Sequence, residues 1–323
     1  MFFGIIASMA LALSSMVILA FFGATLISPL VLALVQGMAI SMMFPRVLPS
    51  LSLGLAFSGK VVLRIGVALY GLRITFEEIA QLGLGPLAQA IIVVVVVFLG
   101  GAWIGRRLGL DRESALLVSC GSAVCGVAAV LALESVLKSQ PHKSSVAVST
   151  VVVFGLLGMV LYPMLYQAGL SGLSPFQEGI YIGATLHEVA NVVVAGSALG
   201  DEVAKNAVVI KMVRVLLLIP LLIGVSLFVG VGDGRKKIAI PWFAIWFIGC
   251  IGVRSSGILP GTLLDAMIHG DTFLLSMAMG ALGLQTDFSK FRGIGGAAFM
   301  LAGILFVLLS VGGYSLTWLL NPR

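Results

Sequence analysis

The chain has 323 residues, of which 60% are hydrophobic and only 10% carry charged side chains. Because an average soluble domain contains roughly a quarter charged residues, this composition excludes a soluble enzyme, a nucleic-acid-binding module and a disordered scaffold. The formal net charge is +6, with 19 Lys and Arg against 13 Asp and Glu, as expected when cytoplasmic loops are rich in basic residues. The composition therefore predicts an all-α, multi-pass integral membrane protein in the lipid bilayer.

About eleven stretches are apolar enough to cross a bilayer, whose hydrocarbon core needs about 20 helical residues. The first lacks a basic leading segment and a cleavage site, so we expect a retained span and not a signal peptide. The loops are too short for a second domain, so residues 1–323 are expected to form a single membrane domain. The expected spans are 3–22, 27–44, 60–73, 86–105, 114–134, 145–167, 176–199, 205–230, 240–256, 271–286 and 294–319.

The distribution of Lys and Arg over the loops favours a cytoplasmic N-terminus and an external C-terminus. Cys120, Cys125 and Cys250 all lie in apolar stretches, so we expect free thiols and no disulfides. The sequence has no Cys/His cluster with metal-ligand spacing. Neither a metal nor another cofactor is therefore expected.

The fifth expected span carries two glycines and two serines in mid-membrane, in the run SCGSAVCG at 119–126. Glycine weakens a helix by about 1 kcal/mol relative to alanine, and freed backbone groups are tolerated at membrane depth only inside protein or beside a wet cavity. The run therefore predicts a discontinuous helix whose N–H groups face an anion. The alternative is close packing of helices through small residues. The expected substrate-binding residues here are Gly121, Ser122, Ala123, Cys125 and Gly126.

The seventh expected span contains the run GATLHEVAN at 183–191. His187 and Asn191 are four residues apart and would share a helix face, with Glu188 beside them. Since a charged group at the bilayer centre costs about 2.5–3.5 kcal/mol, the cluster predicts either a functional site or a hydrogen-bonded structural network. We expect Asn191 to bind substrate and His187 and Glu188 to exchange the coupling ion. A zinc protease is rejected, because its HExxH motif needs a second His where this chain has Asn191.

The eighth expected span places two cations, Lys211 and Arg214, three residues apart on one helix face. Lys211 lies six residues beyond Lys205, which is about 9 Å of helical rise. The two side chains could extend to the membrane surface, but at this depth we favour pairing with an anion. That anion would be Glu188 or a bound substrate, so both cations are expected to bind substrate.

Two pairs of segments resemble each other within the chain. Residues 121–129, GSAVCGVAA, resemble 183–191, GATLHEVAN, and residues 69–76, LYGLRITF, resemble 281–288, ALGLQTDF. The second pair is seven spans apart and would run antiparallel, as in the inverted repeats of secondary transporters, whereas the first pair would run parallel. Gln285, Thr286 and Asp287 are expected at a second helix break that serves the coupling ion.

The strings GSAVCGVAAVLALESVLKS, YIGATLHEVANVVVAG, NAVVIKMVRVLLLIP and TFLLSMAMGALGLQTDFSKFR resemble the YeiH family of sulfate exporters, over about residues 55–319. The resemblance implies a bacterial inner-membrane protein with the fold of the sodium/proton antiporters and bile-acid symporters. That fold has two inverted repeats and a pair of crossing, unwound helices. It also implies sulfate, sulfite or a related sulfur oxyanion or sulfonate as substrate, and is compatible with a homodimer. Where that family has Gln after HEVA, this chain has the shorter Asn191.

The expected function is secondary transport of a small inorganic or organosulfur anion, coupled to a proton or sodium ion, and no enzymatic activity. A sodium/proton antiporter is the main alternative within transport, and a passive channel is another. An intramembrane enzyme would need Cys125 or Ser122 as nucleophile beside His187 as base. A GxxxxGK[ST] phosphate-binding loop does not occur, which disfavours an ATP-driven pump.

Overall fold

The computed structural model describes residues 1–22, 28–44, 48–228, 242–285 and 296–322. Every regular element in these residues is a helix, as predicted. Seven helices there are long and apolar enough to cross a membrane, and three shorter apolar helices accompany them. The seven are Phe2–Phe21, Ser50–Arg73, Leu84–Arg107, His142–Gln167, Asp201–Leu227, Gly261–Gln285 and Gly296–Leu320, and the three are Pro29–Met43, Val127–Leu137 and Trp242–Ser255.

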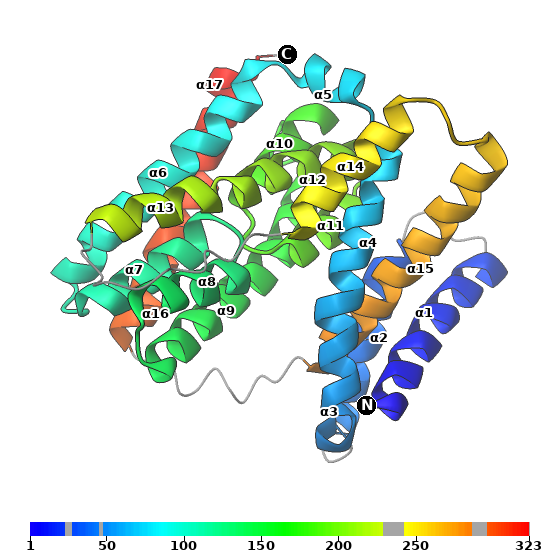
Figure 1. Cartoon of the computed structure of the whole chain (residues 1–323), viewed down its shortest axis with the longest axis horizontal. Helices are drawn as coiled ribbons and strands as arrows, with labels where there is room; N and C mark the ends of the chain where they lie inside the picture. The colour runs from blue at the N-terminus through cyan, green and yellow to red at the C-terminus, as the bar shows by residue number, and fades with distance from the viewer. Residues whose placement is uncertain (23–27, 45–47, 229–241, 286–295, 323) are drawn as a thin grey trace. The chain divides into compact units, whose positions relative to one another are not determined.

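The chain divides into two compact units (Figure 1). The first unit consists of residues 1–81 and 242–288 and the second of residues 82–241 and 289–323. The first contains α1 (Phe2–Phe22), α2 (Pro29–Met43), α3 (Leu48–Phe57), η1 (Ser58–Val62), α4 (Leu63–Leu69), η2 (Tyr70–Arg73), α5 (Phe76–Leu82), α14 (Trp242–Ser255) and α15 (Gly261–Gln285).

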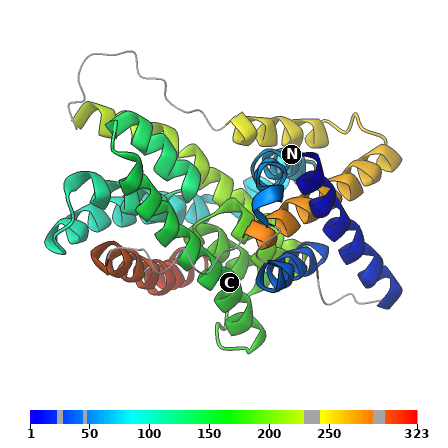
Figure 2. The same cartoon turned by 90° about the horizontal axis from the view of Figure 1, so that it is seen from below.

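Small residues bring the helices of the first unit close together. Helix α15 packs along α2, and α1 lies against both of them (Figures 1 and 2). A Cβ atom at Gly37 of α2 would collide with the Gly280 carbonyl oxygen of α15, and one at Gly283 would collide with the Leu34 carbonyl oxygen. The absence of side chains at these positions therefore permits the close backbone contact, which is the usual basis of helix association in lipid.

Two spans of this unit are longer than predicted. The span expected at 60–73 begins at Ser50, because the chain stays helical through the π-helical turn η1, where the exposed Lys60 suggested a loop. The span expected at 271–286 begins at Gly261, since the polar Asp265 and Asp271 lie inside α15 and do not end it. In both cases we expected the helix to begin at a charged residue, Lys60 or Asp271, but that residue lies inside a longer helix.

The second unit contains the interrupted helices. Its elements are α6 (Leu84–Arg107), α7 (Arg112–Ala123), α8 (Val127–Leu137), α9 (Pro141–Gln167), α10 (Pro175–Thr185), α11 (Val189–Ser197), α12 (Asp201–Leu216), α13 (Leu218–Phe228), α16 (Gly296–Val307), η4 (Leu308–Gly312) and α17 (Gly313–Leu320). Helix α12 packs against α10, α11 and α6, and α7 packs against α6, α8, α9 and α16. Helices α6 and α17 lie side by side (Figure 1).

The first halves of both interrupted helices begin with strong caps. The Asp111 side chain accepts a hydrogen bond from the Ser114 N–H at the start of α7, and a capping box formed by Ser174 and Gln177 begins α10. Burial raises the pKa of Asp111, but hydrogen bonds from the Lys143 ammonium and from Ser114 outweigh it and lower that pKa to about 2. Both helices therefore start at fixed positions before they enter the interior of the unit.

Candidate functional site

Two helices of the second unit are interrupted, and the interruptions lie at equivalent positions of the two similar segments, 121–129 and 183–191. Helix α7 ends at Ala123 and α8 begins at Val127, while α10 ends at Thr185 and α11 begins at Val189. Aligning 121–129 with 183–191 superimposes both ends and both starts. The discontinuous helix predicted at 119–126 is thus confirmed. A single long helix, α9, separates the pair, so this similarity does not represent an inverted repeat.

The second break changes the predicted position of His187. We expected His187 and Asn191 to share one helix face, but α10 ends at Thr185 and His187 lies in the break, outside both helices. Leu186 has extended backbone, with ψ of 147°, and Glu188 is likewise extended at the start of α11. The shared helix face was therefore wrong, because a continuous helical periodicity was assumed through the run GATLHEVAN.

Lys211 of α12 binds the main chain at both breaks. Its side chain is fully buried, and its Nζ donates hydrogen bonds to the carbonyl oxygens of Val124 at 2.7 Å, Leu186 at 2.6 Å and His187 at 2.7 Å. A lysine ammonium has three N–H donors, so these three acceptors use all of them. Lys211 thereby joins the first break to the second.

Arg214 does the same from one turn further along α12. Its Nε and Nη2 donate to the Ala123 carbonyl oxygen and Nη2 also to that of Ser122, while Nη1 donates to those of Gly183 and Leu186. The distances range from 2.7 to 3.3 Å, and the guanidinium is fully buried. All five N–H donors of the guanidinium are therefore directed at carbonyl groups where α7 and α10 end.

The two cations neutralise the negative ends of two half-helices. The last carbonyl groups of a helix have no partner within it, and the helix dipole places partial negative charge there. Lys211 and Arg214 satisfy these groups at both breaks. Since every donor is already used, direct contact between substrate and either cation stays a prediction and would require some of these hydrogen bonds to break.

Glu188 lies at the positive end of α8. The Val127 N–H, the first of that helix, donates a hydrogen bond to the Glu188 carboxyl group. Gly126 precedes it with φ of +73°, and a Cβ atom there would lie 2.5 Å from Glu188 Cγ. Gly126 is thus needed both for the left-handed turn and for the space that Glu188 occupies.

Several polar atoms beside the breaks are buried without a hydrogen-bond partner in the described part of the chain. They are the Ser122 hydroxyl, both ring nitrogens of His187 and Glu188 Oε1. Ser122 and His187 are each only 1% exposed. Since burying an unsatisfied polar group costs about 1–3 kcal/mol, these atoms mark a place where a ligand or water would be stabilised. The His187 ring stacks on Phe306, with ring centroids 6.3 Å apart.

The remaining predicted residues of the second unit are buried at or near the breaks, and their role in substrate binding stays a prediction. A Cβ atom at Gly121 would clash with side-chain methyl groups of Val151 and Val130, so Gly121 permits close helix packing. Asn191, 6% exposed in α11, lies beside Gly155 of α9, where an added Cβ would be 2.5 Å from its amide nitrogen. Cys125 and Ala123 are buried at the first break, and Cys125 is a free thiol, as is Cys120.

The predicted second site for the coupling ion falls in the first unit. Gln285 is the last residue of α15, and its side-chain amide donates to the carbonyl oxygens of Leu55 and Ala281. Thr286 and Asp287 lie outside the described residues. The helix break expected there stays a prediction.

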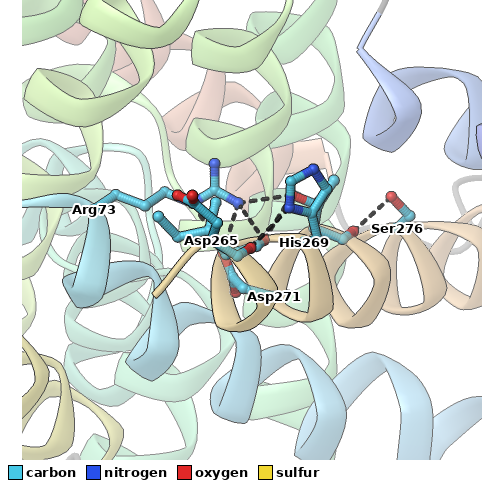
Figure 3. A network of polar contacts seen from close by, with 7 residues as sticks. Arg73, Asp265, His269, Asp271 and Ser276 are labelled. Carbon is cyan, nitrogen blue, oxygen red and sulfur yellow. Dashed lines mark hydrogen bonds and ion pairs between the residues drawn. The ribbon is translucent and has the colours of Figure 1, made fainter. Parts of the chain in front are cut away.

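An ion pair in the first unit was not predicted from the sequence. Arg73, the last residue of the span expected at 60–73, forms a salt bridge of 3.0 Å with Asp271 of α15, whose side chain is only 1% exposed (Figure 3). Arg73 also donates to the Thr272 hydroxyl and the Ile268 carbonyl oxygen, and its guanidinium lies over the Tyr70 ring. The sequence signals that could have predicted this ion pair were an Arg at the end of one apolar stretch and an Asp inside another.

Among the described residues, no group of three or more His, Cys, Asp or Glu side chains is arranged to hold a metal ion. Besides the two cations and the Cys125 thiol, the polar groups at the two breaks include main-chain amides, one hydroxyl, one imidazole and one carboxyl group. This donor set suits hydrogen bonding to a small polar ligand.

Comparison with known proteins identifies the family. The family model described as Conserved hypothetical protein 698 matches residues 2–302. A UPF0324 membrane protein of Bacteroides thetaiotaomicron is 45% identical over 304 residues, covering 91% of this chain and 90% of that protein. Relatives of the same name in Wolinella succinogenes and Pseudomonas putida are 45% and 43% identical, covering 93% and 90% of this chain and 91% and 85% of their own lengths. No solved structure matches the chain. The chain therefore belongs to the Conserved hypothetical protein 698 (UPF0324) family of multi-pass bacterial membrane proteins.

Proposed function

We propose that the protein is a secondary transporter that moves a small anion across the bacterial inner membrane. The observation that carries this proposal is the pair of helix breaks, held by Lys211 and Arg214, inside the second unit. Broken helices at membrane depth are typical of transporter binding sites, where half-helix ends coordinate substrate and ions.

The balance of charge at the breaks supports an anion. Lys211 and Arg214 bring two positive charges, and the acidic side chain that interacts with Lys211 is Glu188. Within the described residues, neither cation forms a salt bridge. The half-helix ends add about half a positive charge at each N-terminus and half a negative charge at each C-terminus, which cancel. One positive charge remains in this sum, and a bound anion would compensate for it.

The chemical class of the anion follows from the donors and from the resemblance to the YeiH family. Main-chain N–H groups at the start of α8, the Ser122 hydroxyl and the His187 ring can each donate to an oxyanion. Sulfate, sulfite or a sulfonate would accept several such bonds at once. We propose one of these sulfur anions as the substrate.

Two rival functions fit these residues less well. A sodium/proton antiporter would be expected to gather carboxylates at the breaks, whereas one Glu lies there beside two cations. An intramembrane enzyme would need His187 hydrogen-bonded to Ser122 or Cys125. In the described residues neither His187 nitrogen has a partner, and the Ser122 hydroxyl has none either. We therefore propose a transporter without enzymatic activity.

Transport into liposomes tests the proposal. Purified protein should take up radiolabelled sulfate or sulfite saturably in a pH gradient, and empty liposomes should not. Ser122→Ala should raise the half-saturation concentration about tenfold, the effect of losing a hydrogen bond to a charged group. Ser135→Ala, on an exposed position of α8, is the matched control and should behave as wild type. Absence of flux for sulfate, sulfite and methanesulfonate would refute the proposal, and an unsaturable current would indicate a channel.

A further inference from the structure

The N-terminus of α8 already holds an acidic group supplied by the protein. The Val127 N–H binds the Glu188 carboxyl group, and Gly126 leaves the space for it. Helix α8 has 11 residues, so its N-terminus carries the partial positive charge of a full helix dipole. An oxyanion that bound the start of α8 would need the same Val127 N–H, and the buried, unpartnered Ser122 hydroxyl and His187 ring belong to the two breaks.

A substrate anion and an ionised Glu188 would compete for the same N–H groups. Both are anionic acceptors, and two negative charges in contact inside a low-dielectric site repel each other strongly. Binding the anion is therefore favoured when Glu188 is neutral. With a proton on Glu188, the two cations leave two positive charges uncompensated, which matches a divalent oxyanion.

The other titratable or charged groups that face Glu188 come from three neighbouring segments. Lys211 reaches it from α12, Cys125 interacts with it from the first break, and His187 precedes it in the chain. Arg214, also on α12, interacts with Cys125. Lys211 and Arg214 use all their donors on carbonyl groups, an arrangement that matches the three donors of an ammonium and the five of a guanidinium. His187 is the other side chain of this set whose ordinary, unperturbed pKa lies close to neutral pH, so the test includes a variant at that position.

We propose that Glu188 and the transported anion alternate at the N-terminus of α8, so that each anion binds together with one proton that Glu188 takes up. The step is an exchange without covalent chemistry. The Glu188 carboxylate accepts a proton from water and releases the Val127 N–H, which the anion then binds. This inference rests on the proposed function and assigns the proton as its coupling ion.

Binding of radiolabelled sulfate at different pH values tests the exchange. Sulfate is the probe because it stays fully ionised near neutral pH. Affinity of the wild type should rise as pH falls, by up to about tenfold per unit over the range in which Glu188 of the free protein is ionised, which is the limiting slope for one linked proton. Glu188→Gln mimics the neutral form and should bind sulfate with an affinity that does not depend on pH. His187→Gln should keep the wild-type slope, as should Glu202→Gln, an exposed control at the start of α12.

The outcomes separate the two proposals. If the wild type binds sulfate and Glu188→Gln keeps the pH slope, the exchange is refuted while anion transport stands. If the slope disappears in His187→Gln instead, the proton is carried by His187 and the exchange is also refuted. If the wild type binds neither sulfate nor sulfite, the proposed function fails, and this inference fails with it. Should Glu188→Gln not fold, proton uptake by the wild type decides: one proton per sulfate is expected, and none contradicts the exchange.

Discussion

Arg214 holds more carbonyl groups than any lysine could. Its guanidinium presents five N–H donors in a fixed plane, and it uses them on four carbonyl oxygens from the ends of α7 and α10. Lys211 has three donors and meets three carbonyl oxygens. The two positions are therefore not interchangeable, although both carry one positive charge.

Replacing Arg214 by Lys should destabilise the protein even though the charge is kept. Lysine has fewer N–H donors than arginine, so some buried carbonyl groups would lose their hydrogen bonds. We expect this to lower the free energy of unfolding by roughly 2–5 kcal/mol. Thermal unfolding in detergent, followed by the loss of monodisperse protein, would measure the change. Arg106→Lys, at the exposed end of α6, is the matched control and should change stability by less than about 0.5 kcal/mol. Equal stability of the two variants would mean that Arg214 does not hold the helix ends.

The residues at the breaks could be predicted from the sequence, but their partners could not. His187, Glu188, Lys211 and Arg214 stand out because ionisable groups are rare in apolar spans. The expectation that both cations face an anion depended on charge alone. Their actual partners are carbonyl groups that become free only where two remote helices end beside α12. The sequence alone does not show that these two helix ends lie beside α12.

At the scale of helices, the first break was predictable and the second was misread. The glycines and serines of 119–126 weaken a helix visibly, and α7 does end there, at Ala123. The run GATLHEVAN keeps a helical periodicity through its break at 186–188, so His187 was assigned to a helix face. The similarity of the two segments was the better guide, because both breaks occupy the same place in it.

The Arg73–Asp271 pair links η2 to α15 and yields a prediction for the first unit. Arg73→Met leaves the Asp271 carboxylate buried without its charged partner and should cost about 3 kcal/mol. Asp271→Leu should cost less, because the Arg73 side chain is 20% exposed and stays partly solvated. The double variant should be more stable than Arg73→Met alone, as measured by thermal unfolding. If the stability loss of the double variant equals the sum of the losses of the two single variants, the two side chains do not stabilise each other.

At the scale of the whole chain, composition alone predicted a helical multi-pass membrane protein. The membrane class is now shown by the family and by the helices that are long enough to span. Span boundaries were predicted less well where charged residues lie inside helices, as Lys60 and Asp271 do. The orientation, the inverted repeat and the expectation that residues 1–323 act as a single transporter domain stay predictions.

Locating a bound anion tests the central claim most directly. Selenate has the geometry and charge of sulfate, and its selenium atom gives an anomalous diffraction signal that marks its position in a crystal. We predict a peak within hydrogen-bonding distance of the Val127 N–H and close to the Ser122 hydroxyl, with the Glu188 carboxyl group displaced from α8. A selenate peak beside Arg73 alone, or no peak at the two helix breaks at concentrations that saturate binding, would contradict the account.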